Sequence, residues 1–361
     1  MSLKPASVTN EVRLVARDAE GRKLEAIQHG VDHRGQYGRY IADTGLINAA
    51  NTALALERPL LLTGEPGCGK SDFAYVAANA LGYGDPLCCY IRSDTRARDL
   101  LYHYDALRRF GDAQHGAPGS ASDPRRYIRL RPLGVALMTP QRRVVLIDEI
   151  DKAPRDLPND LLHEIDAGEF EIVELDGRFD GEEHPDHTGI PLAQKMTPQG
   201  RKPLLVITSN AERQLPEPFL RRCVFYHIPP PNKARLLEIA RARLNHGGPE
   251  GGRSRIAEML KVDLEGLVGA FAALRAHGEA QRFTKLPTTS EMIEWLRVCT
   301  EFYEPVDIGP ALRRIVDSIE NPDRSGRLTM ESGLHWSDLP GITCLVKHRE
   351  DLAKISPSGA R

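Results

Sequence analysis

One short segment limits the possible folds of this chain more than any other: residues 64–71, with the sequence GEPGCGKS. It fits the phosphate-binding pattern GxxxxGK[ST], and it lies between an apolar stretch, LLLT, and an amphipathic helical pattern. The pattern needs this order, because N–H groups of the loop and of the helix start must point at the same phosphates. A glycine-rich turn without a ligand is the alternative, and the flanking strand and helix argue against it.

Short apolar stretches separated by helical patterns indicate the fold around this loop. Five have strand character: residues 59–63, 87–92, 144–148, 204–210 and 223–228. Strands that alternate with helices are typical of a parallel sheet covered by helices. Three prolines, residues 229–231, end this pattern, and the later periodic stretches are helical. We therefore predict an α/β protein with a P-loop NTPase core, built on a parallel five-stranded sheet with flanking helices, followed by a small all-α lid domain.

The loop is predicted to hold the phosphates of ATP. Glycines let the backbone wrap closely round the phosphates, and the N-terminus of the next helix adds partial positive charge. Lys70 is predicted to bridge the β and γ phosphates, and Ser71 to ligate Mg²⁺. The residues expected to contact the nucleotide are Gly64, Glu65, Pro66, Gly67, Cys68, Gly69, Lys70 and Ser71.

A pair of carboxylates ends the third apolar stretch, VVLIDEID at residues 144–151. Side chains alternate along a strand, so Asp148 can reach the shell of Mg²⁺ while Glu149 faces the γ phosphate and polarises a water molecule for attack. A helix N-cap would explain an isolated DE pair equally well. The phosphate-binding loop earlier in the chain favours the catalytic interpretation. Asp151 is predicted to have a capping or structural role.

The fourth apolar stretch ends in Asn210, and two arginines follow it. Asn210 is predicted to orient the attacking water and sense the γ phosphate; a turn-starting asparagine is the alternative. Arg221 and Arg222 end a short helical pattern, where arginines are usually solvated or bound to carbonyl groups. In a ring of subunits, one of them could reach a neighbour's nucleotide as an arginine finger and stabilise transition-state charge.

Charge and composition argue against several kinds of partner. Lys and Arg total 48 against 50 for Asp and Glu, so no net field favours nucleic acid or an anionic membrane. A charged surface interleaved with aspartates explains the arginines between residues 96 and 131 better than a nucleic-acid groove does. A GTPase is disfavoured, because the NKxD sequence that recognises guanine does not occur.

Other residue patterns indicate the compartment. The six cysteines form no CxxC pair, which is typical of reduced thiols in a cytosolic protein. The chain has no signal-like start and no run of about 18 apolar residues, so we expect a cytoplasmic protein without a membrane span. His184 and His187, in EEHPDH, are expected in a solvated loop, since no partner pair lies at the spacing of a zinc site.

Taken together, these motifs resemble AAA+ ATPases, and within that class the MoxR-type and dynein-related branch. The resemblance covers about residues 36–305 and is carried by the stretches 57–71, 131–154, 158–174, 203–223 and 286–296. It implies insertions near residues 95–130 and 170–200 of an ATPase core at 36–230, and a lid at 231–305. The segments outside it are an N-terminal part of unknown role, 1–35, and a C-terminal helical extension and tail, 306–361. Whether that extension docks on the lid stays open.

The resemblance also implies a function. It gives Lys70, Ser71, Asp148, Glu149 and Asn210 the roles above, with Arg222 the better finger match and Arg221 the second. It implies Mg²⁺-dependent ATP hydrolysis in a homo-oligomeric ring, a hexamer, with a chaperone-like action on a protein client, often beside a partner with a von Willebrand factor A domain. The family's usual lid arginine has no clear equivalent. Lys285, ahead of the last lid helix, is a candidate for nucleotide contact from the lid.

Other functions share parts of this pattern. A DNA-translocating or DNA-loading AAA+ motor has the same core and would bind DNA in a salt-dependent way. A monomeric nucleotide-controlled switch would hydrolyse ATP slowly, and Glu149 argues against a purely non-hydrolytic binder. A small-molecule P-loop kinase would not account for Asn210, the arginines or the helical lid.

Overall fold

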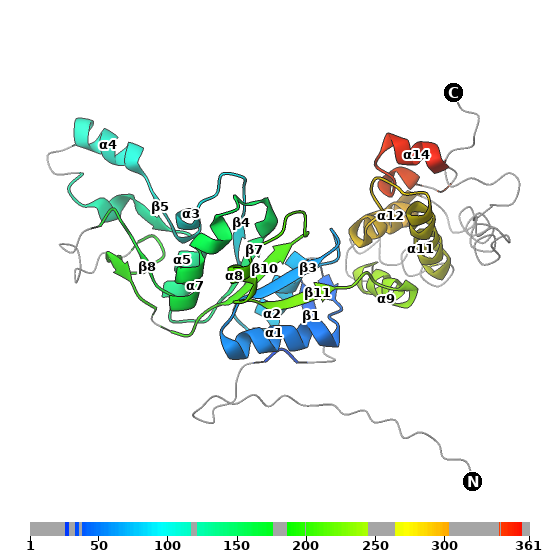
Figure 1. Ribbon diagram of the computed structural model, residues 1–361, viewed down its shortest axis with the longest axis horizontal. Helices are drawn as coiled ribbons and strands as arrows, with labels where there is room; N and C mark the ends of the chain where they lie inside the picture. Colours follow the sequence, from blue (N-terminus) through cyan, green and yellow to red (C-terminus); the bar gives the residue numbers. More distant parts are fainter. Residues whose placement is uncertain are drawn as a thin grey trace, which may run out of the picture.

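A five-stranded parallel sheet forms the centre of the protein. The computed structural model describes residues 26–28, 33–35, 38–116, 121–175, 186–198, 200–244, 264–302, 339 and 341–355. The strands of the sheet are β3 (Leu60–Gly64), β4 (Leu87–Tyr90), β7 (Val144–Asp148), β10 (Leu204–Ser209) and β11 (Val224–Ile228). Their spatial order is β11-β3-β10-β7-β4 (Figure 1). The predicted fold class is confirmed, and the predicted strands differ from these by no more than two residues at either end.

Helices cover both faces of this sheet because its strands are apolar on both sides. Leu60 and Leu62 pack with helices α1 and α2 in one buried cluster, whereas Leu61 between them packs in a second cluster with α5 to α8. These helices are α1 (Thr44–Leu56), α2 (Lys70–Leu81), α5 (Pro132–Met138), α6 (Leu157–Asp160), α7 (Leu162–Ala167) and α8 (Glu217–Leu220). A short antiparallel pair, β1 (His33–Gly35) with β2 (Gly38–Tyr40), precedes α1.

The strand order brings the polar ends of three strands together. β10 lies between β3 and β7, and all three run parallel, with Ser209 beside Thr63 and Ile207 beside Ile147. The phosphate-binding loop, the carboxylate pair and Asn210 therefore leave the sheet at the same edge, which is where ligands bind in open α/β sheets.

Two excursions leave the core on the side away from the lid (Figure 1). The first, between β4 and β7, holds α3 (Ala97–Leu101), α4 (Ala106–His115) and the antiparallel strands β5 (Tyr102–Tyr104) and β6 (Ile128–Leu130), with the 3-10 turn Pro124–Tyr127 before β6. The second is the hairpin of β8 (Phe170–Glu171) and β9 (Lys195–Met196). They lie within the stretches near 95–130 and 170–200.

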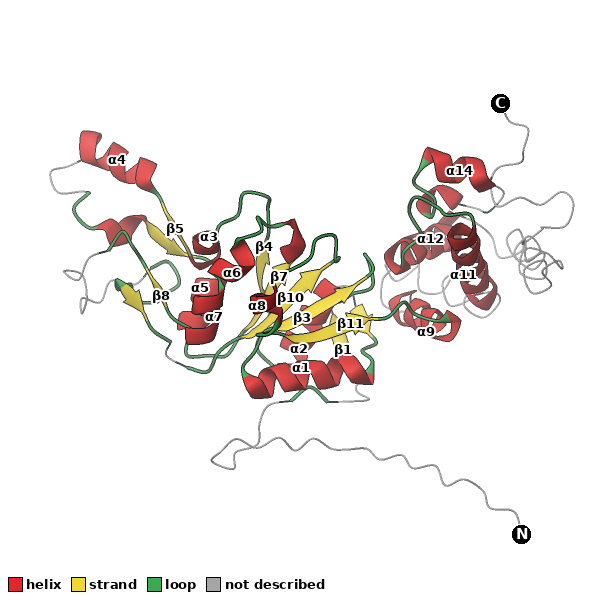
Figure 2. Ribbon diagram, in the orientation of Figure 1, coloured by secondary structure: helices red, strands yellow, loops and turns green. Residues whose placement is uncertain are grey.

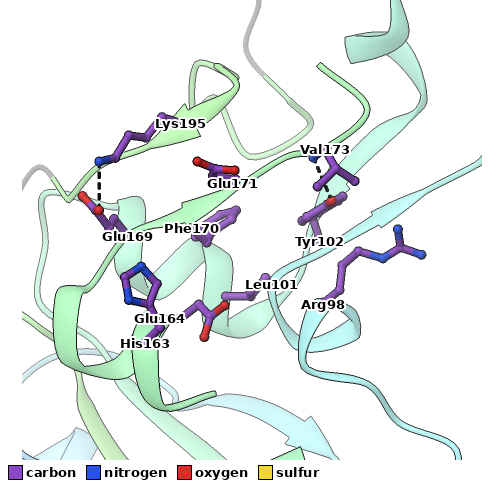
Figure 3. A pocket seen from close by; sticks show the side chains of 10 residues that line it. All are labelled: Arg98, Leu101, Tyr102, His163, Glu164, Glu169, Phe170, Glu171, Val173 and Lys195. Carbon is purple, nitrogen blue, oxygen red and sulfur yellow. Dashed lines mark hydrogen bonds and ion pairs between the residues drawn. The ribbon is translucent and has the colours of Figure 1, made fainter. Parts of the chain in front are cut away.

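The two excursions are joined to each other through Tyr102. Its hydroxyl donates to Glu174 Oε2 at 2.9 Å and accepts from the Val173 backbone N–H at 3.2 Å, and its ring stacks on Phe170 with centroids 6.3 Å apart. Figure 3 shows Tyr102, Phe170 and Val173 at the edge of a hollow of about 430 Å³, which His163 and Glu164 of α7 line from the core side. A shift of α7 would therefore reach both excursions.

The lid is helical and has a separate apolar core. Its helices are α9 (Lys233–Leu244), α11 (Leu264–Ala280) and α12 (Thr289–Phe302) (Figure 2). Part of the C-terminal region also packs on this core. The turn Ile342–Cys344 contributes Ile342, the next residue is Leu345, and helix α14 (Arg349–Ile355) contributes Ile355, all in the same buried cluster as Trp295 of α12. Among the described helices, none is long and apolar enough to cross a membrane.

A buried carboxylate fixes α14 to the lid. Asp351 is 0% exposed, and it accepts hydrogen bonds from the backbone N–H of Thr284 (2.8 Å) and of Lys285 (3.2 Å) and from Lys354 Nζ (3.2 Å). Burial by itself raises the pKa of Asp351, but these donors outweigh burial, so the pKa lies below its ordinary value.

Replacing Asp351 with alanine should therefore destabilise the lid, by about 2–4 kcal/mol at neutral pH, because two backbone N–H groups and Lys354 lose a buried acceptor. A carboxyl group with a lowered folded pKa stabilises the fold above its unfolded pKa of about 3.9, and this contribution is lost as the pH falls through the folded pKa. The thermal unfolding temperatures of wild type and Asp351→Ala should differ most above the unfolded pKa, and this difference should shrink as the pH falls through the folded pKa. Glu350→Gln, at the exposed neighbouring position, is the control; an equal gap at all pH values would contradict the role of the charge.

Candidate active site

The loop between β3 and α2 has a backbone that only glycine accommodates easily. Gly67 and Gly69 have φ angles of +73° and +93°. A Cβ atom at Gly67 would lie 2.6 Å from Ser290 Oγ, and one at Gly69 would lie 2.8 Å from the ring of Tyr40. Gly69 is also the N-cap of α2 and provides no side chain to cap it, so the first N–H groups of this helix are open to an anion.

Lys70 lies buried at the start of α2, 6% exposed. Its Nζ donates hydrogen bonds to the carbonyl oxygens of Gly64 at 2.9 Å and Glu65 at 3.0 Å. A buried ammonium group needs such acceptors, and phosphate oxygens on this loop would be stronger ones because they are charged. The structure thus places the cation inside the loop that is predicted to hold phosphates.

Ser71 and Asp148, the two residues predicted to ligate Mg²⁺, lie in contact. Ser71 Oγ donates to Asp148 Oδ1 at 2.6 Å, so a hydroxyl and a carboxylate of two different elements lie side by side. Oxygen donors of this kind are the ligands that Mg²⁺ prefers, usually with water and substrate phosphates completing the shell. The open helix N-terminus, the tight glycine loop, the buried lysine and this oxygen pair fit Mg²⁺ with a nucleotide.

Thr208 of β10 is hydrogen-bonded to the end of β7, and the sequence did not indicate this role. It is fully buried on β10, its Oγ1 donates to Asp148 Oδ1 at 2.7 Å, and it accepts from the Glu149 backbone N–H at 2.8 Å. A threonine in the apolar run LLVITSN is the only local signal, and β-branched residues are common in strands anyway.

Glu149 and Asn210 are brought into contact. Glu149 has a left-handed backbone, with φ +58°, which is strained for a residue with a side chain and directs it away from the line of β7. Its Oε1 accepts from Asn210 Nδ2 at 3.2 Å, and its Oε2 pairs with Lys152 Nζ at 2.6 Å. The hydrogen bond to Glu149 raises the pKa of Lys152. The carboxylate of Glu149 and the amide of Asn210 thus lie in contact at the edge of the sheet.

The two arginines lie at the surface after α8. Arg221 Nε pairs with Glu217 at 3.3 Å on the same turn. Arg222 Nε pairs with Asp166 of α7 at 2.5 Å, and its Nη1 donates to the Pro218 carbonyl at 3.1 Å. Within the described chain, these contacts do not join either arginine to the cluster of Ser71, Asp148 and Glu149. A role in catalysis would therefore need a second subunit.

Lys285 is engaged inside the lid. Its Nζ lies 2.8 Å from Glu291 Oε1, and Glu291 Oε2 accepts from Thr288 at the start of α12. Lys285, the lid residue considered from the sequence for nucleotide contact, is thus bound to a residue in the first turn of α12. His187 Nδ1 lies 3.2 Å from Asp186, and His184 lies outside the described residues.

Other lid residues contact the loop instead, and no local sequence signal identifies them. Arg275 of α11 pairs with Glu65 at 2.5 Å, and Ser290 Oγ donates to the Gly67 carbonyl at 3.1 Å. Arg243 of α9 also pairs with Asp72 of α2. The lid thus contacts the phosphate-binding loop and the helix behind it.

Comparison with known proteins agrees with this geometry. Residues 59–223 match the family model of the AAA domain, dynein-related subfamily, and the match includes the loop, the carboxylate pair, Asn210 and both arginines. No curated protein sequence matches the chain. The solved structure of the FIGL-1 AAA domain in complex with ADP is similar at 16% identity and a TM-score of 0.32, with 74% of this chain and 66% of that chain covered. The chain thus spans slightly less than two thirds of that structure.

Proposed function

We propose that this chain, whose residues 59–223 form an AAA+ domain of the dynein-related type, hydrolyses ATP to ADP and phosphate. One observation carries the proposal: Ser71 is hydrogen-bonded to Asp148 and Asn210 to Glu149. Thr208 links these two pairs, through Asp148 and the Glu149 backbone, at the edge of the sheet from which the phosphate-binding loop also leaves. A loop for phosphates, oxygen ligands for Mg²⁺, and a carboxylate with an amide for water are the parts that this reaction requires.

Each residue has a separate task in this mechanism. Lys70 and the loop N–H groups would hold the β and γ phosphates. Ser71 and Asp148 would hold Mg²⁺, which would supply positive charge to the phosphate oxygens. Asn210 orients a water molecule in line with the bond to the γ phosphate. Glu149 then accepts a proton from this water as the oxygen attacks phosphorus and the bond to ADP breaks.

The proposal extends to a homo-oligomeric ring, a hexamer, in which Arg222 acts on the neighbour's ATP. Its side chain is 43% exposed, and its described contacts are with Asp166 and the Pro218 carbonyl rather than with Ser71, Asp148 or Glu149, which supports a role in trans. Its partner Asp166 lies on α7, and this helix also lines the hollow shared by the two excursions (Figure 3). A change at the subunit interface could therefore move the excursions through α7.

A protein is the client that this arrangement favours. The balanced charge, 48 basic against 50 acidic residues, gives no field for DNA, and the resemblance to MoxR-type proteins supports a chaperone-like role, with a von Willebrand factor A domain protein as one kind of partner. DNA-stimulated, salt-dependent ATP turnover would instead favour a DNA motor.

The first test is steady-state ATP turnover of the wild type against protein concentration. Specific activity should rise with concentration, because an active interface needs two subunits. Lys70→Ala should weaken ATP binding by about 10²-fold, since charge-assisted bonds to two phosphates are lost. Lys347→Ala, at an exposed lysine of the C-terminal region, is the control and should bind ATP as the wild type does. No turnover at any concentration would reject the ATPase, and turnover independent of concentration would reject the ring and favour a monomeric switch or kinase.

A further inference from the structure

The loop that follows β10 is held by a carboxylate that lies two residues beyond Glu149. Asp151 is 3% exposed, and its Oδ2 accepts hydrogen bonds from the backbone N–H of Asn210 at 3.1 Å and of Glu212 at 3.0 Å. The sequence predicted a capping or structural role for Asp151. In the structure, the group that it caps is the segment carrying Asn210.

This loop depends on side chains for its backbone hydrogen bonds. Between the two N–H groups bound by Asp151, the Ala211 N–H is bound by Ser209 Oγ at 2.9 Å. Ala211 has a left-handed backbone, with φ +59°, which costs about 1 kcal/mol or more for a residue other than glycine. A loop with this strain keeps its shape only while its N–H groups remain bound.

Within the described residues, one side-chain hydrogen bond joins Asn210 to Glu149. The amide of Asn210 reaches Glu149 Oε1 at 3.2 Å, a length at the weak end for such a bond. The backbone anchor at Asp151 therefore sets where the amide lies. Asp151 and Glu149 lie two residues apart in one short segment. Glu149 and the anchor of Asn210 are therefore expected to move together.

We propose that Asp151 is a positioning residue, which holds Asn210 at the water site; this rests on the proposed ATP hydrolysis. Asp151→Ala should lower kcat by about 10- to 100-fold, with the KM for ATP changed by less than about threefold, because the effect falls on transition-state geometry. Asp151→Asn keeps an oxygen that can accept both N–H groups, so it should recover kcat to within about fivefold of wild type.

A double mutant separates positioning from general destabilisation. If Asp151 acts through Asn210, the variant Asp151→Ala with Asn210→Ala should be no slower than Asn210→Ala alone, within about twofold. Multiplied effects of the two substitutions would overturn the proposal. Asp156→Ala, at an exposed carboxylate of the following turn, is the matched control and should leave turnover unchanged.

A measurement without turnover keeps this inference distinct from the proposed function. Amide hydrogen exchange at residues 210 and 212 should be faster in Asp151→Ala by about tenfold or more and near wild type in Asp151→Asn. If the wild type hydrolysed no ATP but Asp151→Ala still exchanged these amides faster, the proposed function would be rejected and the role of Asp151 in holding the loop would be supported. Unchanged exchange, or unchanged kcat in an active enzyme, would reject the positioning role.

Discussion

Arg222→Ala should lower ATP turnover by about 10³- to 10⁵-fold, the range expected when an arginine finger is lost. ATP binding should persist, since Arg222 contacts Asp166 and the Pro218 carbonyl of its own chain and the phosphate loop is intact. Turnover and nucleotide affinity of the purified variant, measured at a concentration where the wild type is fully active, check this result.

Mixing two inactive variants tests whether the arginine acts on a neighbour. In a ring assembled from equal parts of Arg222→Ala and Glu149→Gln, about one quarter of the interfaces pair an intact Glu149 with an intact neighbouring Arg222. The mixture should therefore regain a measurable part of the wild-type turnover, whereas neither variant does so alone. A mixture as inactive as its parts would contradict action in trans.

Arg221→Ala is the matched control for this experiment. The two arginines are adjacent, but Arg221 pairs only with Glu217 one turn earlier in the described contacts, and its side chain is 77% exposed. It should retain turnover within about threefold of wild type, because exposed pairs of this kind contribute little. The opposite result, with Arg221→Ala inactive and Arg222→Ala active, would assign the finger to Arg221.

Local sequence patterns were sufficient for the fold and for most of the candidate site. The apolar stretches, the glycine pattern and the carboxylate pair each depend on residues close together in the chain, so their strands, loop and strand-end positions could be predicted. The sequence predicted a parallel sheet, in which strands end at one edge, but not the strand order that brings Ser71 to Asp148.

Contacts between distant residues could not be predicted in the same way. Thr208 contacts Asp148, and Asp151 contacts the backbone of Asn210, because β10 pairs with β7 so that Ile207 lies beside Ile147. No local sequence pattern specifies this pairing register. The lid contact of Arg275 with Glu65 depends on how two separately packed units meet. For Lys285, a nearby acidic residue, Glu291, competes for the ammonium group, and sequence alone does not show which partner wins.

Glu149→Gln should lower kcat by about 10²- to 10⁴-fold while ATP binding is retained, because the amide has the shape of the carboxylate but accepts no proton from water. The glutamine side chain of this variant would keep an oxygen for Asn210 Nδ2, which now lies 3.2 Å from Glu149 Oε1, so the loop after β10 should stay in place. Turnover, with ATP affinity measured separately, checks this result.

A second glutamate provides the control for the loss of an ion pair. Glu149 and Glu169 are both paired with a lysine at the surface, at 2.6 Å to Lys152 and 2.9 Å to Lys195, but Glu169 lies at the hairpin of β8 and β9. If the effect of Glu149→Gln came from the broken pair, Glu169→Gln and Lys152→Ala would reduce kcat as strongly. We expect Glu169→Gln to have turnover near wild type and Lys152→Ala to retain most of its turnover, since only Glu149 accepts the proton. If Glu149→Gln kept more than about one tenth of wild-type turnover, proton transfer would be assigned to another group.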